Sequence, residues 1–141
     1  MPIGTRTICD HVSFSSSHFA VEPGEDEEAN PAIFGHALAT WVAERLQAHG
    51  IPVEGGVIPE GFGRCVMIRR EPFMLWVTCA NTYGSTTRWQ MFIALEDSLT
   101  RLLFHLADPT PDLQRLREHY RAIVKEVPGV ADVVWEEGGP W

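Results

Sequence analysis

The seven residues from Asn81 to Thr87 form the stretch whose side chains best suit ligand binding. Its sequence, Asn-Thr-Tyr-Gly-Ser-Thr-Thr, joins two apolar runs and carries an amide, several hydroxyl groups and one aromatic ring. Polar loops held by a rigid sheet often carry binding sites, although many are only solvated connections. We therefore predict a small-ligand site made by Asn81, Tyr83, Ser85, Thr86 and Thr87.

Two histidines could add an acid–base group to this loop and make the chain an enzyme, namely His11 and His18. Ser16 and His18 are two residues apart, which in a strand is about 6.6 Å, too far for a nucleophile–base hydrogen bond. The sequence contains no hydrolase, metalloprotease or nucleotide-binding motif with the required spacing. We name no catalytic residue, and the prediction leans away from an enzyme.

Metal and cofactor signals are also weak. Cys9, Cys65 and Cys79 show no C-x-x-C spacing, so the pattern predicts buried thiols rather than zinc ligands. The acidic run within residues 22–29 lacks the Asp/Asn alternation and central glycine of a calcium loop. That run is interpreted as a solvated loop, and neither a metal nor a cofactor is predicted.

The overall charge excludes some partner classes. The chain has 11 basic and 19 acidic residues, a net charge of −8, and five of the acids lie in the 22–29 run. No basic stripe is present to bind phosphates, so neither nucleic acid nor an anionic membrane surface is predicted as a partner. With 141 residues and no secretory signal, the sequence predicts a single cytoplasmic domain over 1–141.

The first helix is the clearest predicted element. Asn30-Pro31 resembles an N-cap followed by proline at the first helical position, and Gly50 provides a left-handed stop. An apolar stripe runs between them at helical spacing, made by Phe34, Leu38, Trp41, Val42 and Leu46. A second helix is predicted over 99–106. A third begins at Thr110-Pro111 and stops at Pro128-Gly129.

Three runs in the middle of the chain predict a β-meander, because they are β-branched and aromatic or alternate with period two. They cover residues 64–70, 73–80 and 88–95. Weaker patterns predict strands over 12–21, 53–58 and 130–135, with a flexible tail at 136–141. The element order β-α-β-β-β-β-α-α-β favours an α+β fold, a two-layer sandwich of helices on a mostly antiparallel sheet.

The meander is apolar on both faces. Met67, Trp76 and Phe92 make it hard to give each strand a wholly polar side, so both sides of the sheet need a cover. We predict that these three residues form an interface with a protein partner or a second copy. The alternative is that the N-terminal segment and the tail cover them.

The chain resembles small uncharacterised bacterial proteins of similar length over roughly residues 30 to 95. The resemblance is carried by the capped helix with Gly50, the turn Glu60-Gly61-Phe62-Gly63, and the runs Leu75-Trp76-Val77-x-Cys79 and Trp89-x-Met91-Phe92-Ile93. These motifs are turn glycines and core aromatics. No function is attached to that group.

The leading hypothesis is a small acidic protein-interaction module, similar in size and charge to secretion chaperones or immunity proteins, and dimeric. The alternative is a small-molecule-binding protein or an enzyme that uses the 81–87 loop.

Overall fold

The computed structural model describes residues 6–21, 34–60, 63–71, 73–82, 84–96 and 108–136. Six strands and two helices lie in this part of the chain. They are β1 (Arg6–Ser15), α1 (His36–Ala48), β2 (Val57–Glu60), β3 (Gly63–Arg69), β4 (Met74–Asn81), β5 (Arg88–Glu96), α3 (Thr110–Glu126) and β6 (Ala131–Glu136).

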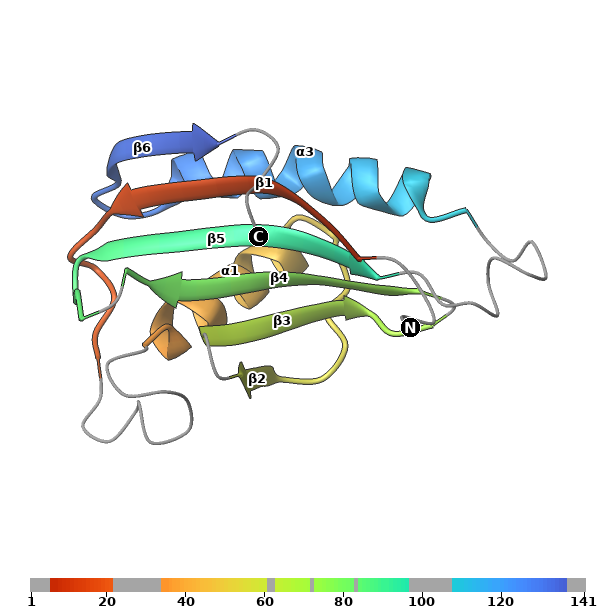
Figure 1. The fold of residues 1–141 in the computed structure, drawn as a ribbon, viewed down its shortest axis with the longest axis horizontal. Helices are drawn as coiled ribbons and strands as arrows, with labels where there is room; N and C mark the ends of the chain where they lie inside the picture. The colour runs from red at the N-terminus through yellow and green to blue at the C-terminus, as the bar shows by residue number, and fades with distance from the viewer. Residues whose placement is uncertain are drawn as a thin grey trace.

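The strands form one antiparallel sheet in the order β2-β3-β4-β5-β1-β6. Both helices lie on one face, behind the sheet in Figure 1: α1 contacts β2, β3 and β4, and α3 lies behind β1 and β6 in that view. The predicted α+β class with a mostly antiparallel sheet is confirmed. The strand order places the N-terminal strand inside the sheet, and the last strand forms an edge.

The first strand differs from its prediction. A strand was expected over 12–21, but β1 runs from Arg6 to Ser15, because Ser16 leaves the ladder and its hydroxyl donates to the Pro128 carbonyl at 2.7 Å. The pairing with β5 shifts between Cys9 and Val12, which is a β-bulge. Asp10 sits in this bulge with a left-handed φ of 55°. The bulge changes which way the neighbouring side chains point.

The first helix starts later than predicted. Phe34 and Gly35 are not helical, α1 begins at His36, and the expected cap at Asn30-Pro31 lies outside the described residues. Gly35 has a φ of 151°, and a Cβ there would lie 2.7 Å from the Cys79 carbonyl oxygen. The extended entry to α1 therefore passes too close to β4 for any side chain. The predicted stop at Gly50 is confirmed, with a φ of 83°.

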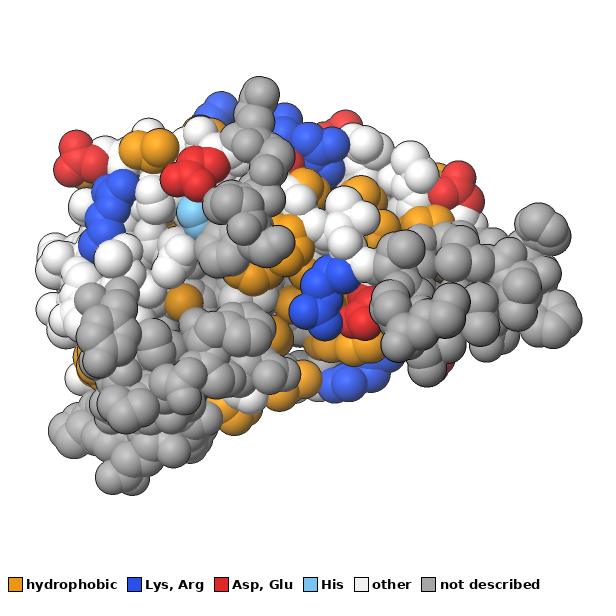
Figure 2. Space-filling view, viewed as in Figure 1, with side chains coloured by type: hydrophobic (Ala, Val, Ile, Leu, Met, Phe, Trp, Pro, Cys, Tyr) orange, Lys and Arg blue, Asp and Glu red, His pale blue; other side chains and the backbone are white. Residues whose placement is uncertain are grey.

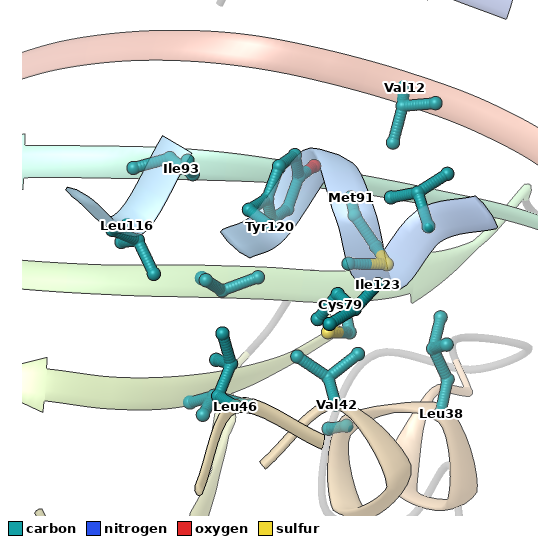
Figure 3. Packing of buried hydrophobic residues seen from close by; sticks show 14 of the residues in the cluster. Val12, Leu38, Val42, Leu46, Cys79, Met91, Ile93, Leu116, Tyr120 and Ile123 are labelled. Atoms are coloured by element: carbon teal, nitrogen blue, oxygen red, sulfur yellow. The ribbon is translucent and has the colours of Figure 1, made fainter. Parts of the chain in front are cut away.

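The main core lies between the helices and the sheet. Leu38, Val42 and Leu46 of α1 point toward the sheet, as Figure 3 shows. Leu116, Tyr120 and Ile123 of α3 point into the same cluster, and all six side chains are buried. The strands contribute alternate residues from the same face, among them Val12, Val77, Cys79, Met91 and Ile93.

The opposite face is also apolar in its centre. Cys65, Met67, Trp76, Phe92 and Ala94 form a second buried cluster on β3, β4 and β5. Over β1 and the start of β5, the same face of the sheet is polar and includes His11, Gln90 and Arg88. Figure 2 shows this face, with hydrophobic side chains in the middle of the view.

Several predictions fall outside the described residues. These are the acidic loop of 22–29, the helix expected over 99–106 and all of the predicted tail except Glu136, which belongs to β6. The helix predicted from Thr110 is confirmed as α3, and the strand predicted over 130–135 is β6, shifted by one residue. The strand expected over 53–58 is β2, which begins only at Val57.

Candidate functional site

A groove of about 590 Å³ opens between β1, β6 and α3, and we call it the edge groove. It is lined by Ile8, Cys9, Asp10, Arg117, Arg121, Lys125, Trp135 and Glu136. Lys and Arg side chains gather along the upper margin of Figure 2, over α3 and β6. The lining brings three formal positive and two formal negative charges into one place, whereas the whole chain carries −8.

The basic wall of the edge groove follows from helical spacing. Arg117, Arg121 and Lys125 lie four residues apart, so they share one flank of α3. The helix face beside this flank is buried against the sheet through Leu116, Tyr120, Ile123 and Val124. The flank on the other side faces α1, where Arg115 donates to the Gly50 carbonyl. The basic flank is therefore turned away from α1, toward the outer edge of the sheet.

Asp10 anchors this wall. Its carboxylate, only 3% exposed, accepts hydrogen bonds from Arg117 Nε at 3.0 Å and from Arg121 Nε at 2.8 Å and Nη2 at 3.2 Å. Its backbone carbonyl accepts a bond from the Tyr120 hydroxyl at 2.9 Å. Charge-assisted bonds of this kind fix the position of a guanidinium. The β1 bulge thus orients two arginines of a helix more than 100 residues later in the chain.

Cys9 lines the same groove but is poorly suited to be a nucleophile. Burial raises the pKa of its thiol to about 11, and the negative charge of Asp10 adds to this increase. The charges of Arg117 and Arg121 act in the opposite direction without offsetting it. Since the thiolate is the reactive form, the thiol stays protonated and unreactive near neutral pH.

The chemistry available in the edge groove is therefore recognition of negative charge. Guanidinium groups bind carboxylates and phosphates through paired N–H donors, and Lys125 adds a point charge beside them. Within the described residues, no group of three or more His, Cys, Asp or Glu side chains could hold a metal ion.

The predicted ligand loop is held together by its own polar groups. Asn81 is buried, its Oδ1 accepts from the Phe34 N–H at 2.9 Å, and its Nδ2 donates to the Ser85 carbonyl at 2.8 Å. Ser85 Oγ accepts from the backbone N–H groups of Thr87 and Arg88. These bonds fasten the start of α1 and close the β4–β5 turn.

The remaining residues of that loop are placed as follows. Thr86 and Thr87 are exposed, and the Thr87 carbonyl accepts from the Ser16 N–H at 2.9 Å. Tyr83 lies outside the described residues. A ligand role for these residues stays a prediction.

His11 is brought near this loop through Gln90. The Nε2 of His11 lies 3.3 Å from Gln90 Oε1, and Gln90 Nε2 donates to the Asn81 carbonyl at 3.1 Å. His11 Nδ1 lies 3.2 Å from Glu136 Oε2, so the buried imidazole ties β6 to β5. His18 is elsewhere, with its ring edge-on to Phe19 at 5.1 Å.

The predicted interface residues do come together. Met67, Trp76 and Phe92 belong to the second cluster, on the face opposite the helices. Each is at most 8% exposed within a single copy. Met67 and Trp76 also line a shallow hollow of about 170 Å³, where Arg6 lies over the Trp76 ring and pairs with Glu96. Their part in an interface stays a prediction.

Edge strand β6 was not singled out by the sequence. Among the described residues, its Val133, Val134 and Trp135 are the only exposed large hydrophobic side chains, at 40%, 47% and 41%. The Trp135 ring lies 6.1 Å from that of Tyr120, so Trp135 is on the helix side of the sheet. The basic spacing on α3 was readable in the sequence, but nothing local connected it with Asp10 or with β6.

Comparisons with protein-family models, curated proteins and solved structures found no match to this chain. No helix in the described part of the chain is both long and apolar enough to span a membrane.

Proposed function

We propose that this protein is a protein-interaction module that binds an extended segment of a partner along β6. The observation that carries the proposal is the exposure of three consecutive large hydrophobic residues, Val133 to Trp135, on the last strand of the sheet. An edge strand offers backbone N–H and C=O groups to an added strand, and its side chains supply contacts on both faces.

The two edges of the sheet differ in how well they suit strand addition. β2 has four residues and contains Pro59, which has no N–H to donate. β6 has six residues and no proline. Natural proteins commonly blunt exposed edges with proline, so β2 has the features of a protected edge. Strand addition is therefore favoured at β6.

The other features agree with a small interaction module. All three cysteines are free thiols, which supports a reducing, cytoplasmic compartment. The size and acidity of the chain suit a bacterial chaperone-like or immunity-like protein. The alternative is a ligand-binding or catalytic role for the 81–87 loop. It has less support because the polar side-chain atoms of Asn81 and Ser85 form hydrogen bonds within the chain.

Site-specific photo-crosslinking tests the proposal. A benzophenone amino acid at Val134 should crosslink a defined partner in the source cell, while the same group at Glu44, exposed on α1, should not. Hydrogen exchange on the purified complex should then show slower exchange in β6 than in the free protein.

The proposal would be wrong if both positions captured the same proteins, or if exchange in β6 were unchanged in the complex. Proline substitutions in β6 test directly whether its backbone N–H groups pair with the partner. Successive N–H groups of a strand point to opposite sides, so Val133→Pro and Val134→Pro are both made. One of the two removes an outward donor and should abolish complex formation without loss of circular dichroism signal.

A further inference from the structure

We infer that the segment docking on β6 is acidic, and that its carboxylates are bound by the basic flank of α3 in the edge groove. The inference rests on the proposed function and names the chemistry of the partner. It is argued from the position of three cations, the way Asp10 holds two of them, and the sign of the charge in the groove.

The first step is position. A strand added to β6 would run beside Val133 and Trp135, with the α3 flank on the helix side of the sheet. Arg121 and Lys125 are exposed on that flank, and Trp135 lines the same groove. Side chains of the added strand that point to the helix side would therefore meet cations next to an aromatic ring.

The second step is orientation. The Asp10 carboxylate accepts three hydrogen bonds from Arg117 and Arg121, and only one of the five N–H donors of Arg117 takes part in them. Asp10 neutralises one of the two charges and holds both groups by their Nε side. A carboxylate that enters the groove would meet guanidinium groups that are already positioned, which lowers the entropic cost of binding.

The third step is charge. The groove lining sums to +1, from Arg117, Arg121 and Lys125 against Asp10 and Glu136. Lys125 is the only lysine of the chain, and no described side chain forms a salt bridge with it. In a protein with a net charge of −8, this local excess of positive charge favours an acidic segment over a basic one.

A second copy of this chain fits the groove less well. Pairing of two β6 strands around a twofold axis would bring the basic flanks of the two α3 helices toward each other. Like charges so placed oppose association. The homodimer is therefore an outcome of the test rather than the occupant we assign.

Fluorescence anisotropy with labelled peptides tests the inference. The probe is a hexapeptide of alternating valine and glutamate, which matches the six residues of β6. Its counterpart has lysine in place of glutamate, and an oligothymidylate serves as a polyanion without β-strand propensity. The acidic peptide should bind at least tenfold more tightly than the lysine peptide, and its affinity should fall as salt increases.

Substitutions that remove positive charge test whether the basic flank of α3 binds the acidic peptide. Lys125→Gln should weaken binding of the acidic peptide about three- to tenfold, and Lys125→Gln with Arg117→Gln should weaken it further. Arg70→Gln is the matched control for the single variant, because Arg70 is exposed just after β3, does not line the edge groove, and the same unit of charge is lost. Arg70→Gln should leave the affinity unchanged.

The possible outcomes separate the two proposals. If both peptides bound equally well, and Val133→Pro or Val134→Pro abolished that binding, the inference of an acidic partner would be wrong and strand addition to β6 would still hold. Acidic binding that both proline variants retain would overturn strand addition, and the proposed function with it. Two further outcomes would overturn the inference. One is tighter binding of the oligothymidylate than of the acidic peptide. The other is a homodimer that forms at high protein concentration and is disrupted by a proline substitution in β6.

Discussion

The buried hydroxyl of Tyr120, on α3, donates a hydrogen bond to the backbone carbonyl of Asp10, on β1, at 2.9 Å. Tyr120 is fully buried, and Asp10 is held there with a left-handed φ that only a few residue types adopt readily. The bond therefore links the conformation of the strand bulge to the position of the helix, and the edge groove depends on both.

Tyr120→Phe should lower the free energy of unfolding by about 1–3 kcal/mol, because the buried carbonyl of Asp10 loses its donor while the packing of the ring is kept. Urea denaturation measures this difference. The partner peptide should also bind more weakly, since the bulge that holds Arg117 and Arg121 is less well defined. An unchanged midpoint would mean that water replaces the hydroxyl without cost.

Asp10→Asn should cost about 2–4 kcal/mol, because it removes the charge shared by Arg117 and Arg121 while asparagine still tolerates the left-handed backbone. The estimate lies below the full cost of breaking a buried ion pair because Arg121 is half exposed. Thermal unfolding with Arg70→Gln as a surface-charge control measures it. A melting temperature equal to that of the wild type would show that Asp10 does not anchor the wall.

Asn81→Ala should destabilise the protein by about 1–3 kcal/mol, because the Phe34 N–H and the Ser85 carbonyl both lose a partner. Thr86→Ala, at an exposed site in the same loop, should change the stability by less than about 0.5 kcal/mol. Chemical denaturation of the two variants tests whether the polar groups of the 81–87 loop stabilise the fold or are available to bind a ligand. A stable Asn81→Ala protein that had lost affinity for a small ligand would favour the binding loop.

Alkylation of Cys9 by iodoacetamide should be slow at neutral pH, because its thiol pKa is raised to about 11. The thiolate fraction, and hence the rate, should rise about tenfold per pH unit up to that value. Asp10→Asn should speed the reaction at a given alkaline pH, since the negative charge that raises the pKa is gone. Peptide mass spectrometry gives the rate for Cys9 alone, and a plateau near pH 9 would contradict the raised pKa.

Glu126 should make the stability depend on acid pH. Burial raises the pKa of Glu126, but the hydrogen bonds and charges of Arg45 and His49 together lower it more, so the pKa lies below its ordinary value of 4.5. A lowered pKa in the folded state gives stability that is fully present above the ordinary value and is lost as pH falls through the folded value. The difference in melting temperature between wild type and Glu126→Gln should therefore shrink as the pH falls below about 4.5. A difference that grew on acidification would contradict this sign.

Local patterns in the sequence were enough to predict most of the elements. The proline and glycine that bound α3, the Gly50 stop of α1 and the apolar runs of β3, β4 and β5 each act over a few residues, and each is found where it was predicted. The four-residue spacing of Arg117, Arg121 and Lys125 also places them on one helix flank, although no basic stripe was predicted from the sequence.

The candidate site was decided only by tertiary structure. The edge position of β6 depends on β1 pairing between β5 and β6, and such long-range pairing leaves no local pattern. The hydrogen bond between Asp10 and Arg117 of α3 joins residues more than 100 positions apart in the sequence. The side-chain amide of Asn81 accepts a hydrogen bond from the Phe34 N–H, just before α1. A side chain available for binding and one that satisfies a buried backbone group look the same in a sequence, because only the folded chain determines which donors and acceptors remain.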